Sequence, residues 1–520
     1  MVIPRRSREE FLGRPRIDFR QYKNFGNDRI EQIKLGLPAE PPIYYKLTPL
    51  QRTCFVIGAT RKRFSFFNAT GTGKALLSIA LIRYFRKLGI IKSALILVPN
   101  RLNKYEFAKE LAKHSPTSSF LLLDGSTADK WRLLEKDRSL FVIETYSGLS
   151  RLVCPKRYVI KKGKNTGDKE LAPDAGLIKK LCERFGGLVC DESQYTGSHT
   201  KLPFRICRQI AKKAEVVFAL TATPFNRDPT LLWAQMFLVD GGETLGETLG
   251  LFRSVFCKEK VNFFSGRTEY TFDKKKQDLL HKFIANKSID FESAKGTLPE
   301  CTYTKEVVRM PEEAQAYYRK FRDALVAARG NYQEGKNAFI RLRQISSGFV
   351  GFTDDETGEK AKFAFPDNPK LDMLLSILRG TKEGEKNIIF FDFTWSGERL
   401  LEALKKSGRG AVLLYGKTKN VDAVRQQFMD DPRVQDLVLQ NKFGVGLNIQ
   451  IARSGIFYES PISAIVRKQC RGRFVRQHAL HKRVNEIDLV MDGTIDAQIL
   501  ENIKEGGDLL KRIINGEVPL

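Results

Sequence analysis

The stretch "FFNATGTGKALLSIAL", residues 66–81, has the residue types of a loop that binds the phosphates of a nucleotide. Gly71 and Gly73 let backbone amides approach phosphate oxygens, and Lys74 can reach the outer phosphates. The usual loop of this kind continues with Ser or Thr, whose hydroxyl binds magnesium, whereas here Ala75 follows the lysine. The pattern therefore indicates either a chance match or a nucleotide enzyme that coordinates its metal in another way.

Two carboxylates and two threonines supply further groups for such chemistry. In "GGLVCDESQ" an apolar run ends in Asp191 and Glu192. A nucleotide hydrolase places one carboxylate there on magnesium and a second on the attacking water. In "VVFALTATPF" another apolar run ends at Thr221 and Thr223. Together with the loop, these residues favour a nucleotide hydrolase.

The elements that must position these residues are indicated by alternating patterns. Between residues 60 and 240, short apolar runs alternate with segments of helical periodicity, which is typical of parallel β-α-β units. The runs are "FSFF", "ALILV", "FLLL", "LFVI", "GLVC" and "VVFAL". A second series follows residue 385, with "NIIFF", "AVLLY", "DLVLQ", "SGIFY" and "NEIDLV". The sequence therefore predicts an α/β protein with two doubly wound sheets.

The remaining segments differ in composition from these two series. Residues 241–385 are rich in charged, helix-favouring sequence, and we expect helical insertions there. Residues 156–176 are polar and rich in lysine, which fits a basic loop that contacts DNA as well as it fits a solvated insertion. The expected order is a basic arm (1–45), a first lobe (46–240), helical insertions and linker (241–385), a second lobe (386–495) and a helical C-terminal segment (496–520).

The composition limits the class of partner. Among 520 residues, 88 Lys and Arg face 60 Asp and Glu, so the net charge is +28 and favours nucleic acid over membrane as the partner. The eight cysteines form no Cys-x-x-Cys pair, and the five histidines show no metal-binding spacing, so we expect neither a zinc site nor a disulfide framework. No stretch has the length of a signal peptide core or a membrane span, which predicts a cytosolic protein.

A series of short segments resembles, in order, the motifs of superfamily 2 helicases over about 430 residues. They are Gln51 in "LTPLQ", "NATGTGK", "ILVPN", "VIETYSGL", "DESQ", "LTATP", "NKFGVGLN" and "QCRGRFVRQ". Other segments are similar to the Swi/Snf family of DNA-translocating ATPases. These are "LTATPFNRDPTLLW", "RLRQISSGF", "NPKLDMLLSIL", "LLYGKTKNVDAVRQQF", "GVGLNIQIA", "RKQCRGRFVRQ" and "DGTIDAQIL". The resemblance implies two RecA-like domains with helical insertions between them, and it makes a chance match at the loop untenable.

The resemblance also implies roles for individual residues of the first lobe. Gln51 would recognise adenine, Lys74 would hold the β and γ phosphates, Asp191 would bind magnesium, and Glu192 would orient or deprotonate the hydrolytic water. Gln194, where the family usually has His, would couple the ATP site to the relay residues Thr221 and Thr223. The full set of expected nucleotide-binding residues is Gln51, Asn68, Thr70, Gly71, Thr72, Gly73, Lys74 and Ala75.

The resemblance also implies an arginine-finger motif in the second lobe and DNA contacts in both lobes. Gln469, Arg473 and Arg476 match the arginine-finger motif, and a guanidinium suits the charge that develops on a transferring phosphoryl group. Because these residues are far from Lys74 in the sequence, hydrolysis should require the two domains to close on each other. The expected DNA contacts are Asn100, Thr145 and Tyr146 in the first lobe and Lys417, Thr418 and Asn448 in the second.

These inferences predict an ATP-dependent motor of Swi/Snf type that moves on duplex or branched DNA, with ATP and Mg²⁺ as cofactors. It would bind DNA without sequence specificity, as a monomer and away from membranes. Two alternatives stay open at this point: a strand-separating helicase of replication or recombination, and a weakly catalytic ATP-gated DNA-binding scaffold. We expect a cytoplasmic location in a bacterium or a virus-infected cell, or the nucleus in a eukaryote.

Overall fold

The computed structural model describes residues 47–68, 72–154, 157–159, 169–224, 229–261, 268–289, 299–328, 331–353, 360–443, 449–475, 480–505 and 509–514. The chain divides into two compact units. The first lobe comprises residues 1–260 and 268–293, and the second lobe comprises residues 261–267 and 294–520.

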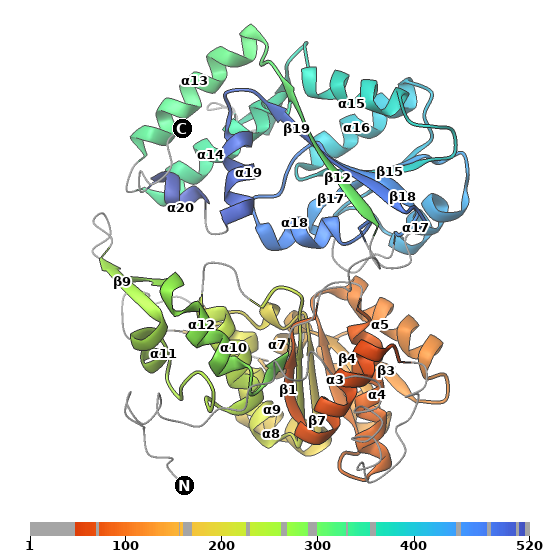
Figure 1. Ribbon diagram of the computed structural model, residues 1–520, viewed down its shortest axis with the longest axis vertical. Helices are drawn as coiled ribbons and strands as arrows, with labels where there is room; N and C mark the ends of the chain where they lie inside the picture. Colours follow the sequence, from red (N-terminus) through yellow and green to blue (C-terminus); the bar gives the residue numbers. More distant parts are fainter. Residues whose placement is uncertain are drawn as a thin grey trace. The chain divides into compact units, whose positions relative to one another are not determined.

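A seven-stranded sheet forms the centre of the first lobe, in the order β11-β1-β8-β7-β2-β4-β3 (Figure 1). Every neighbouring pair in it is parallel. The strands are β1 (Arg63–Phe66), β2 (Ala94–Val98), β3 (Phe120–Leu122), β4 (Phe141–Thr145), β7 (Gly187–Asp191), β8 (Val216–Leu220) and β11 (Ser288–Ile289). Because the strands are parallel, the loops that follow them share one edge of the sheet.

Helices cover both faces of this sheet (Figure 1). Side chains of β7 alternate between the two hydrophobic cores, since Val189 packs with α3, α4 and α5, whereas Leu188 and Cys190 pack with α7 to α10. The helices are α3 (Pro49–Arg61), α4 (Lys74–Lys87), α5 (Arg101–His114), α6 (Thr127–Lys136), α7 (Tyr146–Val153), α8 (Ala175–Arg184), α9 (Leu202–Lys213), α10 (Pro229–Asp240), α11 (Leu249–Phe256) and α12 (Gln277–Ile284). Hairpins β5 (Arg157–Val159) with β6 (Lys169–Leu171) and β9 (Cys257–Val261) with β10 (Thr268–Phe272) are separate from the sheet.

The second lobe has a six-stranded sheet in the order β12-β19-β18-β15-β17-β16, again with parallel neighbours (Figure 1). Its strands are β12 (Glu300–Val308), β15 (Lys386–Phe391), β16 (Ala411–Leu414), β17 (Asp436–Gln440), β18 (Ala452–Phe457) and β19 (Arg483–Met491). Its helices are α13 (Glu312–Ala327), α14 (Tyr332–Ile345), α15 (Pro369–Arg379), α16 (Thr394–Lys406), α17 (Val421–Asp430), α18 (Ala464–Arg471), α19 (Ile495–Glu505) and α20 (Leu509–Ile514). A hairpin of β13 (Phe349–Thr353) and β14 (Lys360–Ala364) packs with α13 and α14.

The two parallel sheets confirm the predicted fold class of two RecA-like domains. Residues 241–385, which the composition assigned to helical insertions, also contain strands, and β12 belongs to the second sheet. β12 is an edge strand with mostly exposed polar side chains, so it has no apolar run that would mark it in the sequence. None of the helices in the described ranges is long and apolar enough to span a membrane.

Candidate nucleotide site

The phosphate loop lies between the end of β1 and the start of α4 at Lys74. Gly73 is the N-cap of α4 and adopts a left-handed backbone with φ of +75°. A Cβ atom at this position would lie 2.2 Å from Nε2 of Gln51, so both the backbone and the available space require glycine. Lys74 Nζ donates a hydrogen bond of 3.0 Å to the carbonyl oxygen of Asn68, the residue that follows Phe67 after β1.

Gln51 connects this loop to the start of α3. Its Oε1 accepts from the backbone N–H of Thr48 at 2.9 Å as part of a capping box, and its Nε2 donates to the carbonyl oxygen of Thr72 at 2.8 Å. The side chain is buried. The predicted adenine-reading residue therefore also binds the backbone just before Gly73 and Lys74.

The remaining loop residues are only partly within the described structure. Asn68 is buried and donates through Nδ2 to Sγ of Cys54 at 3.4 Å, while its Oδ1 accepts no hydrogen bond from the described residues. The predicted contacts of Thr70 and Gly71 lie outside the described residues. Ala75 packs its methyl group against the apolar core beneath α4, and its carbonyl oxygen accepts from Ser78 Oγ at 2.8 Å.

We expect Ala75→Thr to lower the magnesium concentration needed for half-maximal ATP hydrolysis, because the added hydroxyl could bind the ion directly. Ala75→Val is the matched control, since valine has the shape of threonine without the hydroxyl. The measurement is a magnesium titration of ATP turnover for the three proteins. An unchanged or raised requirement in Ala75→Thr would show that water-mediated coordination is built into the site.

Asp191 ends β7 at the same edge of the sheet as the phosphate loop. Burial raises the pKa of its carboxyl to about 7, the neighbouring charge of Glu192 adds to this increase, and the charge of Lys74 opposes it. A divalent cation would favour the ionised form of such a carboxyl. Tyr146 is buried and donates its hydroxyl proton to the carbonyl oxygen of Asp191 at 2.8 Å. Through this contact Tyr146 helps to position Asp191, and its predicted contact with DNA stays a prediction.

Glu192 has the strained backbone that is common at functional sites, with a left-handed φ of +47°. Its Oε2 accepts from Nε2 of Gln194 at 2.8 Å and from Oγ1 of Thr221 at 3.3 Å. Thr221 Oγ1 in turn accepts from the backbone N–H of Thr223 at 2.9 Å. The structure thus brings together the predicted water-activating carboxylate, the predicted coupling residue Gln194 and the two predicted relay threonines.

Sequence reasoning missed Gln235 on α10, which is completely buried. Its Oε1 accepts from Ser193 Oγ at 2.6 Å, and its Nε2 donates to the carbonyl oxygens of Pro224 and Leu231. Gln235 therefore joins the loop after β7 to the loop after β8. The only signal in the sequence is a polar residue in the otherwise apolar segment "LLWAQMFL".

Asn100 and Thr145 lie at the ends of β2 and β4 and cap the helices that follow. Asn100 Oδ1 accepts from the N–H of Asn103 at 3.0 Å, and Thr145 Oγ1 accepts from the N–H of Gly148 at 2.9 Å. Both line a cavity of about 400 Å³. Their predicted contact with DNA stays a prediction.

In the second lobe, Gln469 lies on α18 and is buried, and both polar atoms of its amide lack hydrogen-bond partners within the described ranges. Such a group costs about 1–3 kcal/mol unless a ligand or another residue satisfies it. Arg473 follows in the turn after the helix, where its backbone N–H donates to the carbonyl oxygen of Cys470 at 3.0 Å. The predicted roles of Arg476 and Asn448 lie outside the described residues.

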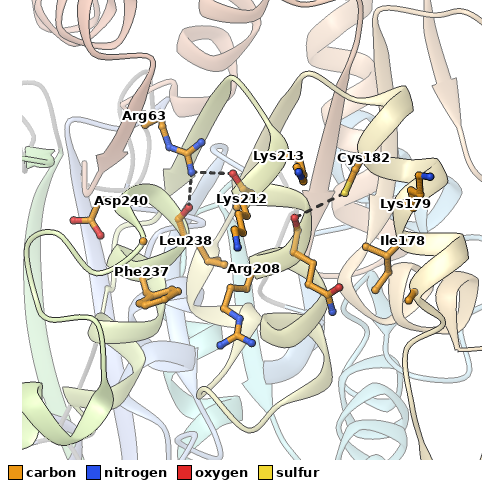
Figure 2. A pocket seen from close by; sticks show the side chains of 14 residues that line it. Arg63, Ile178, Lys179, Cys182, Arg208, Lys212, Lys213, Phe237, Leu238 and Asp240 are labelled. Atoms are coloured by element: carbon orange, nitrogen blue, oxygen red, sulfur yellow. Dashed lines mark hydrogen bonds between the residues drawn. The ribbon is translucent and has the colours of Figure 1, made fainter. Parts of the chain in front are cut away.

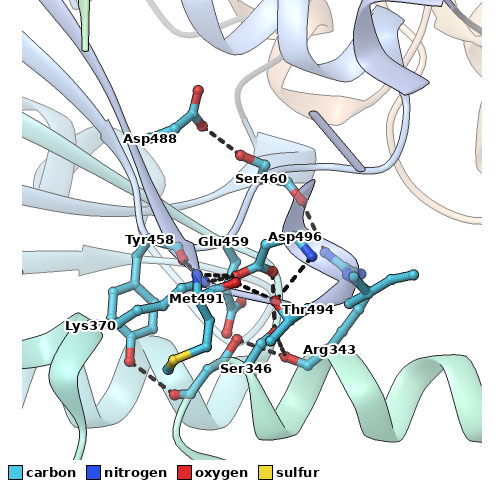
Figure 3. A network of polar contacts seen from close by, with 12 residues as sticks. Arg343, Ser346, Lys370, Tyr458, Glu459, Ser460, Asp488, Met491, Thr494 and Asp496 are labelled. Carbon is cyan, nitrogen blue, oxygen red and sulfur yellow. Dashed lines mark hydrogen bonds and ion pairs between the residues drawn. The ribbon is translucent and has the colours of Figure 1, made fainter. Parts of the chain in front are cut away.

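Arg467, which sequence reasoning also missed, fixes α18 to β19. Its guanidinium donates to Oδ1 and Oδ2 of Asp488 at 2.6 and 2.7 Å and to Oε1 of Glu486 at 2.8 Å, and all three side chains are buried. Asp488 also accepts from Ser460 Oγ at 2.6 Å, and the carbonyl oxygen of Ser460 accepts from Arg343 at 3.1 Å (Figure 3). This polar network gives the segment with Gln469 and Arg473 a rigid support.

The two other predicted DNA contacts of the second lobe follow β16. Lys417 is exposed and its Nζ donates to Oε1 of Glu398 at 3.0 Å. Thr418 Oγ1 accepts from the backbone N–H of Tyr415 at 3.0 Å and so closes a turn. The side chain of Lys417 is exposed and could contact a polyanion, whereas the hydroxyl of Thr418 already accepts a hydrogen bond within the turn.

The residues present fit a nucleotide with a magnesium ion. The orphaned Oδ1 of Asn68, the glycine-requiring turn and Lys74 provide polar groups for phosphates. Among the described residues, no cluster of three His, Cys, Asp or Glu side chains could hold a metal ion by itself. Magnesium usually keeps several waters and takes one or two carboxylates plus phosphate oxygens, and Asp191 is the carboxylate that this site offers.

Parts of this chain are similar in sequence to known proteins. Residues 22–226 match the family model described as "Type III restriction enzyme, res subunit". The chain is 31% identical over 157 residues to Helicase SWR1 of Eremothecium gossypii and 30% identical over 157 residues to Helicase SWR1 of Kluyveromyces lactis. Each match covers 28% of this chain and 10% of the relative, so the chain spans about a tenth of the length of these curated relatives.

Two solved structures are also similar to this chain. A structure described as "Sulfolobus solfataricus SWI2/SNF2 ATPase core in complex with dsDNA" is 20% identical, with a TM-score of 0.40, and the match covers 92% of this chain and 95% of that chain. A structure described as the Sulfolobus solfataricus SWI2/SNF2 ATPase core domain is 20% identical, with a TM-score of 0.38 and 90% of each chain covered.

Proposed function

We propose that this chain, a superfamily 2 helicase-like ATPase of Swi/Snf-like sequence, hydrolyses ATP to move along duplex DNA. The observation that carries the proposal is the set of contacts around Glu192. One carboxylate oxygen accepts from both Gln194 and Thr221, and Thr221 binds the backbone of the next loop at Thr223. A change at the γ-phosphate would therefore reach a second loop of the same lobe through hydrogen bonds.

The chemistry that we propose is the activation of water beside a bound nucleotide. Magnesium would neutralise charge on the phosphates, and Asp191 would hold it through an oxygen ligand. Lys74 would bind the outer phosphates, and Glu192 would orient or deprotonate the attacking water through the carboxylate oxygen Oε1, since Oε2 already accepts two hydrogen bonds. Arg473, from the second lobe, would stabilise the charge that develops on the γ-phosphoryl group.

The proposed partner is DNA, bound through its phosphates and without sequence specificity. The net charge of +28 supports this partner, as does the resemblance of the sequence to DNA-translocating ATPases. The curated relatives are fungal proteins, so they lend no support to the expectation of a bacterial or viral source. We also propose that the chain acts as a monomer and that the predicted residues of both lobes contact the DNA.

We expect duplex and branched DNA to stimulate ATP hydrolysis more than single strands, with stimulation that fades as salt rises, because contacts with phosphates release counterions. We also expect ATP-dependent displacement of a triplex-forming third strand, without unwinding of a tailed duplex, because backbone contacts displace no bases. Lys74→Ala is the control for ATP dependence.

The same assays distinguish the alternatives. Unwinding of the tailed duplex without displacement of the third strand would contradict translocation on duplex DNA and support a strand-separating helicase. DNA binding that responds to ATP, but without DNA-stimulated turnover, would instead support an ATP-gated scaffold.

A further inference from the structure

A cavity of about 760 Å³ lies in the first lobe (Figure 2). It is at the opposite edge of the sheet from the proposed nucleotide site. It is lined by α8, α9 and α10 and by Arg63, the first residue of β1. The phosphate loop follows the other end of the same strand. Because the strands are parallel, the cavity belongs to the amino edge of the sheet and shares no lining residue with the proposed ATP site.

Arg63 closes one end of this cavity by binding the C-terminal ends of two helices. Its guanidinium donates to the carbonyl oxygens of Ala211 and Ala214 at the end of α9, at 2.9 and 2.7 Å. It also donates to those of Leu238 and Val239 near the end of α10, at 3.4 and 2.7 Å. Partial burial lowers the pKa of this guanidinium, though arginine stays charged at physiological pH. Arg63 therefore offsets the negative ends of both helix dipoles, which would otherwise repel an anion.

Cationic side chains make up much of the cavity lining. Arg208, Lys212 and Lys213 are exposed on the last two turns of α9, and no ion pair joins them to the described residues. Lys179, on α8, has one distant partner in Glu183 at 3.9 Å, and both of these side chains are exposed. Arg208 and Lys212 are four residues apart on one helix face, where like charges repel each other. A bound anion would relieve this repulsion.

The floor of the cavity is apolar. Ile178 and Leu238 are buried, and Phe237 is partly buried with its ring centroid 4.9 Å from that of Trp233 (Figure 2). The one acidic lining residue, Asp240, uses its carboxylate to accept from the backbone N–H groups of Gly242 and Thr244 at 2.8 and 3.0 Å. The cavity thus presents an apolar base beneath a cationic rim.

We propose that this cavity binds an acidic segment of a partner protein. An apolar side chain of that segment would pack on Ile178 and Phe237, and flanking carboxylates would pair with Arg208, Lys212 and Lys213. A peptide suits the cavity better than duplex DNA, because a duplex presents its phosphates on a convex surface and offers no apolar group that could enter a concave base. The cavity would be a docking site separate from the proposed ATP and DNA sites.

The probe is a fluorescent peptide in which one leucine is flanked on both sides by glutamates, and binding to the full chain is followed by fluorescence anisotropy. Arg208→Glu combined with Lys212→Glu should weaken binding at least about tenfold, since both cations of the rim would then repel the peptide. Lys113→Glu combined with Lys136→Glu is the matched control, because it changes the net charge equally at exposed residues that do not line the cavity.

Replacing the leucine of the peptide with glycine should also weaken binding at least about tenfold, the lower end of the effect of burying a leucine side chain. ATP turnover without DNA should be unchanged in both double variants, which verifies that they fold. Equal losses in the two double variants would overturn the proposal in favour of unspecific charge attraction. The competing outcome is tested with a short DNA duplex. If the duplex displaces the peptide, and if its affinity for the Arg208→Glu, Lys212→Glu variant falls as much as that of the peptide, then the cavity is a nucleic-acid surface and the proposal is wrong.

Discussion

Glu192→Gln is expected to bind ATP and to hydrolyse it at least about a hundredfold more slowly, the scale for loss of a carboxylate that positions or deprotonates water. Glutamine keeps the size of the side chain but cannot accept a proton. It would also have to rotate its amide so that an oxygen faces Gln194 and Thr221, which both donate to Oε2 in the structure. The measurements are single-turnover hydrolysis and binding of a fluorescent ATP analogue.

The control for this variant is Glu135→Gln, which removes an exposed carboxylate from the same lobe. It should hydrolyse ATP at the rate of the unmodified chain. Near-normal turnover in Glu192→Gln would remove Glu192 from the catalytic role. Loss of ATP binding in Glu192→Gln would instead show that the carboxylate supports the fold of the phosphate loop.

Arg473→Ala is expected to reduce DNA-stimulated hydrolysis by about 10³-fold or more, the lower end of the range for an arginine that stabilises a transferring phosphoryl group. The affinity for ATP should change little, because the phosphate loop, Gln51 and Asp191 all belong to the first lobe. The measurement compares turnover with saturating duplex DNA and the dissociation constant of an ATP analogue. Arg476→Ala should behave in the same way.

Arg433→Ala is the matched control in the second lobe. Its guanidinium is exposed and pairs with Asp431 at 3.0 Å, close to it in the sequence, so its removal should leave turnover unchanged. A loss of turnover in Arg473→Ala together with an equal loss of ATP affinity would contradict the proposed role in the transition state. Equal activity of Arg473→Ala and the unmodified chain would mean that hydrolysis does not depend on this residue of the second lobe.

The inner strands of both sheets could be predicted from the sequence because they are buried on both faces. "VVFAL" coincides with β8 and "DLVLQ" with β17, and residues of this kind form continuous apolar runs. β12 could not be predicted in this way, because its side chains are mostly exposed and its partner β19 is far along the sequence. A periodic pattern of apolar residues indicates which faces of a strand are buried. An edge strand with exposed polar side chains has few apolar residues and so lacks this pattern.

In the candidate site, too, some features could be predicted from the local sequence, whereas others depend on contacts between distant segments of the chain. Glu192 and Thr221 could be singled out because each follows a recognisable apolar run, whereas the coupling role of Gln194 was implied by the family resemblance. The structure places Gln194 and Thr221 within hydrogen-bond distance of Glu192. The contacts of Tyr146 with Asp191 and of Gln235 with Ser193 could not be predicted, because these partners come from other segments of the chain. A buried polar side chain is identified by what it contacts, and only the folded chain shows that.

If Gln51 reads adenine as proposed, its contact with Thr72 would limit how this protein could change its nucleotide preference during evolution. Its amide already connects the start of α3 to Thr72, and it fills the space that a side chain at position 73 would need. A substitution that favoured another base would at the same time release the carbonyl of Thr72 and leave a gap beside Gly73. Variants with altered base preference should therefore be found first at residues around the base, and drift at Gln51 itself should be accompanied by compensating changes in the loop.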